Sequence, residues 1–189
     1  MESTPEYFTQ APGQKMLKLL PKAGQRYGLS AWHTHMPMIV TALCRLQPKR
    51  ILELGIGDYS TALIGAYVRG SDAQALSLEN DFHEGWYEGL TWMSTPQHEI
   101  RKIEEWDYTQ WPGPWDFVFI DQGPELERIP ALKYYLETGA KVVGIHDCNY
   151  PGRYQELLDQ FKYVVHDQTH QFFTTLASNE VDITKWFRP

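Results

Sequence analysis

Two apolar runs of this sequence each end in side chains that can move a proton or hold a cation. Asp121 follows the first run, and His146 and Asp147 follow the second, with Asn149 close behind. A histidine titrates near cellular pH, so His146 is a candidate general base, with Asp121 as the other. Oxygens of Asp121, Asp147 and Asn149 could instead hold a magnesium-type ion that lowers the pKa of a bound hydroxyl group. We predict that Asp121, His146 and Asp147 are catalytic, and both mechanisms stay open.

A third apolar run breaks into a Gly-x-Gly turn. Gly55 and Gly57 can adopt backbone angles closed to other residues and let a ligand approach the main chain. Residues 60–68 then place apolar side chains at helical spacing, and Ser60 or Asp58 can cap that helix. Strand, glycine turn and helix form half of a βαβ unit, which predicts a nucleotide-type ligand at the turn.

The charges around this turn favour a cationic ligand over a pyrophosphate. A dinucleotide turn has a third glycine, but here Ser60 takes that place and Asp58 adds a negative charge. S-adenosylmethionine has no phosphate and carries a sulfonium and an ammonium group, which suit Glu53 and Asp58. Glu79 follows Gly57 by about 20 residues, the spacing at which a carboxylate reaches both ribose hydroxyls. The predicted cofactor-binding residues are Glu53, Gly55, Gly57, Asp58, Ser60 and Glu79.

Residues 53–57 (Glu-Leu-Gly-Ile-Gly) and 115–121 (Trp-Asp-Phe-Val-Phe-Ile-Asp) resemble the corresponding runs of class I S-adenosylmethionine-dependent methyltransferases, and the resemblance covers residues 49–178. It implies a Rossmann-like sheet of strand order 3-2-1-4-5-7-6. It also implies methyl transfer from S-adenosylmethionine to oxygen or nitrogen of a small-molecule acceptor. Asp107 would then bind the adenine amino group, and Asp121 would lie beside the sulfonium.

Within that family, the spacing resembles the catechol-type O-methyltransferases, which use Mg²⁺. That subgroup places an amide directly after the second aspartate, whereas here Cys148 intervenes before Asn149. The metal therefore stays an alternative to a protein base. Two other functions remain open: a noncatalytic module that binds S-adenosylmethionine or a nucleotide, and a nicotinamide-dependent oxidoreductase, which Ser60 and Asp58 disfavour. Arg128 follows the fourth strand, and we expect it to be exposed on a helix, with pairing to an acidic acceptor as the alternative.

Strands and helices must alternate to position these residues. After the turn, the pattern predicts a strand at 73–79, a helix at Trp86 and Tyr87, strands at 98–103 and 116–121, a helix at 125–137, a strand at 141–146, a helix at 154–161, and a hairpin of 163–166 with 171–176. This order predicts a doubly wound, mostly parallel α/β sheet with helices on both faces. Runs that are apolar without alternation indicate central strands.

The 189 residues, 42% of them hydrophobic, fit a single domain, with a helical or lid segment at 1–48 and a Rossmann-like core at 49–178. Helices are expected at 15–20 and 36–46. Between them, His33 and His35 flank Thr34 in a segment without periodicity, which could form a lid or a substrate wall. We expect these two histidines to face solvent.

The net charge of −7 argues against nucleic acid as a partner. The acidic N-terminus is followed by no apolar stretch long enough for a signal peptide or a membrane span, so we expect a cytoplasmic protein with no membrane partner. Two cysteines suggest neither a disulfide framework nor a zinc site. The oligomeric state is not predicted.

Overall fold

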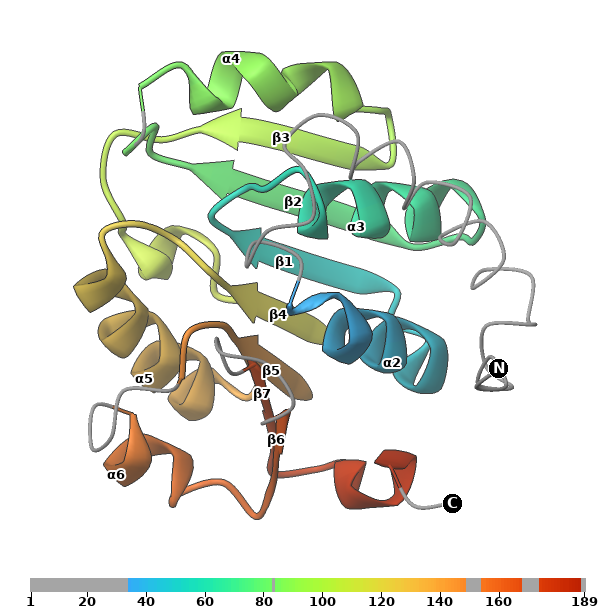
Figure 1. The fold of residues 1–189 in the computed structure, drawn as a ribbon, viewed down its shortest axis with the longest axis vertical. Coiled ribbons are helices and arrows are strands. Elements are labelled where there is room, and N and C mark those ends of the chain that lie inside the picture. Colours follow the sequence, from blue (N-terminus) through green and yellow to red (C-terminus); the bar gives the residue numbers. More distant parts are fainter. Residues whose placement is uncertain (1–33, 83, 149–153, 168–173, 188–189) are drawn as a thin grey trace.

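The computed structural model describes residues 34–82, 84–148, 154–167 and 174–187. The helix predicted at 15–20, together with His33 and Asn149, lies outside the described residues. Within them, strands and helices alternate as expected (Figure 1). The strands are β1 (Arg50–Leu54), β2 (Gln74–Glu79), β3 (His98–Lys102), β4 (Phe117–Ile120), β5 (Val142–Ile145), β6 (Tyr163–Asp167) and β7 (Thr174–Ser178).

These strands form one seven-stranded sheet of order β3-β2-β1-β4-β5-β7-β6, which confirms the predicted order. All neighbouring pairs are parallel except β7, which runs antiparallel to both β5 and β6. Along β1, Glu53 pairs with Ser77 of β2 on one side and with Phe119 of β4 on the other. The carboxyl ends of β1, β2, β4 and β5 therefore meet at one edge, where open α/β sheets bind their ligands.

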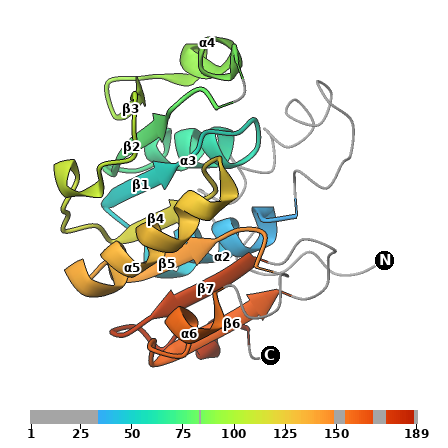
Figure 2. The ribbon, with the colours of Figure 1, turned by 90° about the vertical axis from the view of Figure 1, so that its left-hand side faces the viewer.

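Helices cover both faces of the sheet (Figures 1 and 2). They are α2 (Met36–Leu46), α3 (Ser60–Arg69), α4 (Trp86–Leu90), α5 (Arg128–Thr138) and α6 (Gln155–Leu158), with short 3-10 turns η3 (Thr91–Met93), η4 (Tyr108–Gln110), η5 (Glu125–Glu127) and η6 (Ile183–Phe187). Ile51 and Phe119 face the core beneath α2 and α3, whereas Leu52 and Val118 face the core beneath α5 and α6. Because side chains alternate along a strand, both faces of the central strands are apolar.

Three local details differ from the sequence prediction. Tyr59 precedes α3 and makes no side-chain cap; Ser60, one of the two expected caps, is instead the first residue of the helix and is buried. The helix expected from 125 begins as the tighter turn η5 before α5. The helix expected at 154–161 is α-helical only to Leu158, because Phe161 N then bonds to Leu158 O, three residues back, at 3.0 Å.

Of the described helices, none is long and apolar enough to cross a membrane.

Candidate functional site

The glycine turn passes against the end of β4, and this contact requires Gly55. Gly55 has φ +85°, and a Cβ atom added to it would lie 2.5 Å from Gln122 Cα, a backbone atom. Its amide donates to Leu78 O at 2.9 Å. Gly57 differs, because its amide donates to Thr61 Oγ1 at 2.9 Å and its φ is not left-handed. The turn is thus fixed to the ends of both strands that flank β1.

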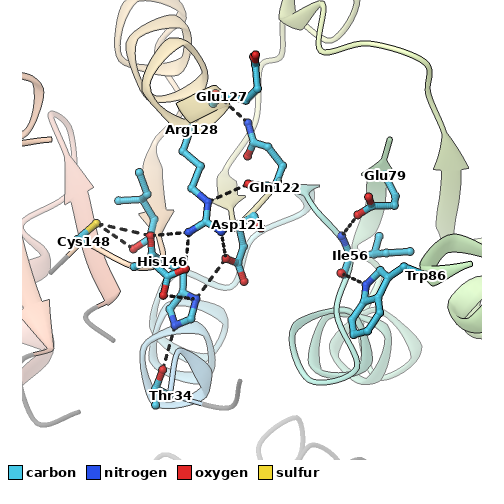
Figure 3. A network of polar contacts seen from close by, with 12 residues as sticks. Thr34, Ile56, Glu79, Trp86, Asp121, Gln122, Glu127, Arg128, His146 and Cys148 are labelled. Carbon is cyan, nitrogen blue, oxygen red and sulfur yellow. Dashed lines mark hydrogen bonds and ion pairs between the residues drawn. The ribbon is translucent and has the colours of Figure 1, made fainter. Parts of the chain in front are cut away.

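Glu79 lies at the end of β2, as predicted, and its carboxylate reaches the glycine turn. Oε2 accepts from Ile56 N at 3.0 Å and Oε1 accepts from Asp81 N at 2.8 Å. On the other side of Ile56, the Trp86 indole donates to Ile56 O at 2.6 Å (Figure 3). Burial raises the pKa of Glu79, against the effect of these amide donors, which favour the charged form. The backbone of Phe82 is a further donor to this carboxylate, which leaves part of its acceptor capacity for a ligand.

Glu53 does not reach this edge, so the predicted direct contact with a cationic ligand does not hold. It lies two residues after Ile51, on the same face of β1, and its side chain is fully buried beneath α3. Thr61 Oγ1 donates to Glu53 Oε2 at 2.9 Å, and Ser77 Oγ donates to the same oxygen at 2.5 Å. Because Thr61 also accepts from Gly57 N, Glu53 supports the glycine turn from below. Asp58 and Ser60, also predicted to bind the cofactor, are buried in the same turn.

The buried hydrogen bonds continue from Glu53 to the edge strand β3. Ser77 Oγ lies 2.7 Å from Nε2 of His98, which is fully buried. Burial raises the pKa of Glu53 to about 7, against hydrogen bonds from Ser60, Ser77 and Thr61, and burial lowers the pKa of His98 to about 4. Both groups therefore favour their neutral forms, as expected for titratable side chains enclosed in a core.

We expect Glu53→Gln to remove a pH-dependent penalty on stability. The folded protein holds Glu53 at a pKa of about 7, above its ordinary 4.5, so the free energy of unfolding falls as pH rises between these values. Glutamine cannot ionise, so the variant should gain about 3 kcal/mol relative to the wild type between about pH 4 and about pH 8. Urea unfolding of both proteins across this range measures the difference.

His98 has the opposite dependence, because a lowered histidine pKa costs stability as pH falls below 6.5. It is present in both proteins and cancels in the comparison. Glu99→Gln, at an exposed position of β3, is the matched control, and its difference from the wild type should stay constant with pH. A Glu53→Gln difference that is equally constant would contradict the assignment.

Asp107 follows β3 and caps the turn η4. Its Oδ1 accepts from Thr109 N at 3.2 Å, and its Oδ2 accepts from Gln110 Nε2 at 3.1 Å. The neighbouring Trp106 indole donates to Gly123 O at 3.2 Å, so this loop lies against the loop that follows β4. Contact between Asp107 and an adenine stays a prediction.

Asp121, His146 and Asp147 converge at the ends of β4 and β5, as predicted. His146 Nδ1 lies 3.2 Å from Asp121 Oδ1 (Figure 3). It also lies 3.5 Å from Asp147 Oδ1. Burial alone would lower the pKa of His146, but Asp121 raises it. Burial likewise opposes ionisation of Asp121, yet His146 and Arg128 hold its pKa at about 2. The carboxylate of Asp121 is therefore charged throughout the physiological range.

Arg128 is not exposed on its helix, and that expectation is wrong. It is buried at the first residue of α5, where its guanidinium lies 3.0 Å from Asp121 Oδ1 and 2.7 Å from Asp147 Oδ2. It also donates to three backbone carbonyls, those of Gln122 at 2.9 Å, His146 at 3.1 Å and Asp121 at 3.2 Å (Figure 3). A cation of the chain itself thus bridges the two carboxylates. Because the guanidinium pairs with both carboxylates, this arrangement argues against Asp121 and Asp147 as two ligands of one magnesium ion.

Thr34 and His35, in the segment before α2, also belong to the site. The sequence predicts only a lid or a substrate wall for this segment. Thr34 Oγ1 lies 2.9 Å from His146 Nε2, and the ring of His35 lies 4.8 Å from that of His146, centroid to centroid. His35 is buried against Phe119, so the expectation that it faces solvent is wrong. The His-Thr-His spacing was the available signal, but nothing local links it to a strand end more than 100 residues away.

No family model and no curated protein sequence matches the chain. Solved structures do resemble it. The O-methyltransferase TomG from Streptomyces achromogenes, in complex with S-adenosylmethionine, is 17% identical with a TM-score of 0.54, over 87% of this chain and 89% of that one. The methyltransferase PaMTH1 from Podospora anserina, bound to S-adenosylhomocysteine, is 15% identical with a TM-score of 0.57, over 87% of both chains.

A third structure, the 16S rRNA N2 G1207 methyltransferase of T. thermophilus in complex with AdoMet and guanosine, is 13% identical with a TM-score of 0.53, over 76% of this chain and 42% of that one. With the strand order and the closing β6–β7 hairpin, the comparisons lead to one conclusion. The chain has the fold of the class I S-adenosylmethionine-dependent methyltransferases, as its sequence predicted.

Proposed function

We propose that the chain transfers a methyl group from S-adenosylmethionine to an oxygen or nitrogen atom of a small-molecule acceptor. The observation that carries the proposal is the placement of Glu79, whose carboxylate ends β2 and bonds to the backbone of the glycine turn at Ile56. In a class I fold, that position faces the ligand edge of the sheet. The remaining acceptor capacity of the Glu79 carboxylate suits the hydroxyl groups of a ribose.

The remaining cofactor contacts are assigned to residues at the same edge of the sheet, where the parallel strands end. We assign the backbone at Gly55 and Gly57 to the methionine portion of the cofactor, with Asp58 and Ser60 beside it. Asp107 accepts a hydrogen bond from the adenine amino group, and the charged Asp121 attracts the sulfonium. Glu53 takes part only by holding the turn, through Thr61.

The acceptor is activated at the ends of β4 and β5. S-adenosylmethionine supplies the methyl group and leaves as S-adenosylhomocysteine. Asp121 orients the ring of His146 by accepting from Nδ1, so Nε2 takes up the proton that the acceptor loses, through the Thr34 hydroxyl group that contacts it. Asp147 acts through Arg128, which holds both carboxylates in place. The net charge of −7 supports a small acceptor over a polyanion such as RNA.

We expect Glu79→Ala to weaken binding of S-adenosylhomocysteine by about 10- to 100-fold, because charged hydrogen bonds to the ribose are lost. Isothermal titration calorimetry measures the affinity. Glu99→Ala, at an exposed position of β3, should bind as the wild type does. Because Glu79 also bonds to Ile56 N, Glu79→Gln is the second variant, which keeps one acceptor oxygen in place.

Equal affinity in Glu79→Ala and the wild type would show that the ribose assignment is wrong. A wild-type protein that binds NAD tightly and ignores both S-adenosylmethionine and S-adenosylhomocysteine would overturn the proposed function as a whole. Melting temperatures of all variants establish that each titration reports on folded protein.

A further inference from the structure

Two imidazole rings and a carboxylate converge where α2, β4 and β5 meet. One ligand atom from each of His35, Asp121 and His146 lies within 4.8 Å of the other two. The three residues come from the start of α2 and the carboxyl ends of the two strands, so three separate elements bring them together. Both histidines are buried, and Asp121 is about four-fifths buried.

The separations are close to those of ligands around one ion. Two ligand atoms on a first-row metal ion at about 2.1 Å lie about 3.0–3.4 Å apart when they are adjacent. Nδ1 of His146 and Oδ1 of Asp121 are already 3.2 Å apart. The longest separation in the group, at most 4.8 Å, must close by about 1.4–1.8 Å through rotation of the side chains.

Each of the three side chains is also supported from outside the group. Metal-binding histidines usually engage their other ring nitrogen in a hydrogen bond that fixes the ring. Nε2 of His146 has such a contact with Thr34 Oγ1 at 2.9 Å, which leaves Nδ1 toward Asp121. Arg128 holds Asp121, and Phe119 packs against the ring of His35. Contacts of this kind hold the ligands of a metal site in position.

We propose that His35, Asp121 and His146 bind a divalent first-row transition-metal ion, with Zn²⁺ as the representative case. Two nitrogen donors and one carboxylate are a typical protein ligand set for such ions and leave positions open, whereas Mg²⁺ prefers oxygen donors throughout. Arg128 neutralises one of the two nearby carboxylates, Asp121 and Asp147, which leaves one net negative charge to attract a cation. The ligand set is distinct from the predicted Asp121, Asp147 and Asn149.

Binding of the ion does not depend on the proposed methyl transfer, but its use would. If the acceptor binds as proposed, the ion lies beside it and lowers the pKa of its hydroxyl group; this consequence rests on the proposed function. With the ion on Nδ1, the ring proton of His146 lies on Nε2, so neither ring nitrogen can accept a proton. In the metal-bound protein, the ion therefore replaces His146 as the activating group.

Calorimetric titration with Zn²⁺, supported by metal analysis of the dialysed protein, tests the proposal. We expect one equivalent to bind, with no competition from excess Mg²⁺. His35→Gln and Asp121→Asn should each weaken binding at least about 10- to 100-fold. His166→Gln removes an exposed histidine of β6 and should leave the affinity unchanged. Co²⁺ added to the wild type should develop visible d–d absorption of nitrogen and oxygen ligation, without any mutation.

Unchanged Zn²⁺ affinity in His35→Gln, an equal loss in His166→Gln, or no uptake of Zn²⁺ or Co²⁺ by the wild type would each overturn the site. Circular dichroism establishes that the variants are folded. Titration of S-adenosylhomocysteine into the same His35→Gln protein measures cofactor affinity and so tests the proposed function separately. His35 is not among the residues assigned to the cofactor. Failure of one proposal is therefore distinguishable from failure of the other.

Discussion

Replacing Arg128 by alanine is expected to lower the free energy of unfolding by about 3 kcal/mol, because removal of one partner from a buried ion pair leaves the other charges uncompensated. Here two carboxylates, Asp121 and Asp147, lose their cation, and three backbone carbonyls lose their donor. The carboxylates are 21% and 23% exposed, so water recovers part of the loss and the lower end of the usual range applies. Urea unfolding measures the change.

Arg101→Ala is the matched control for Arg128. Arg101 pairs with Glu99 on the surface of β3 at 2.7 Å, with side chains 48% and 57% exposed, so its loss should cost no more than about 0.5 kcal/mol. Arg128→Lys should recover only part of the stability, because one ammonium group cannot reach both carboxylates and three carbonyls. Equal stability of Arg128→Ala and Arg101→Ala would contradict the bridging role.

Gly55→Ala is expected to cost about 4 kcal/mol, the sum of about 1–2 for a left-handed alanine and about 1–3 for overpacking. The added Cβ meets Gln122 Cα at 2.5 Å and Gln122 N at 2.6 Å. Backbone atoms cannot rotate away as a side chain does, so either the glycine turn or the end of β4 must shift. Equilibrium unfolding in urea gives the cost.

Gly139→Ala separates the two contributions. Gly139 ends α5 at φ +79°, almost the same backbone angle, but nothing lies within 4 Å of an added Cβ atom. Only the conformational strain remains, and the expected cost is about 1–2 kcal/mol. If both alanine variants lost the same stability, contact with Gln122 would have no part in the requirement for glycine at position 55.

The sequence predicts the fold well because its signals are local and repeated. The helix expected at 36–46 matches α2, and each strand is found within a few residues of its expected range. The positions of Glu79, Asp121 and His146 follow from one rule, that parallel strands bring their carboxyl ends to one edge. Glu53 was expected at the ligand edge because of its charge, without regard to the face of β1 on which its side chain lies. Its distance of two residues from the buried Ile51 already indicated the interior.

Arg128 and His35 could not be placed in the same way. Arg128 was expected to be exposed because a charged residue on a helix usually is. Its partners lie at the ends of β4 and β5, and no pattern within the helix indicates them. His35 depends on contacts with β4 and β5, which no local pattern contains.

The buried chain from Glu53 through Ser77 to His98 has a consequence for how the strands find their register. Strands that are apolar on both faces can slip along one another and still bury hydrophobic side chains, so hydrophobicity alone distinguishes poorly between alignments. A slip of β2 by one residue would place Leu76 or Leu78 beside Glu53 and strip its carboxyl group of a buried hydrogen bond. The buried hydrogen bonds therefore favour one alignment of β1 and β2, because a misaligned sheet loses them. This alignment places the glycine turn next to the end of β2.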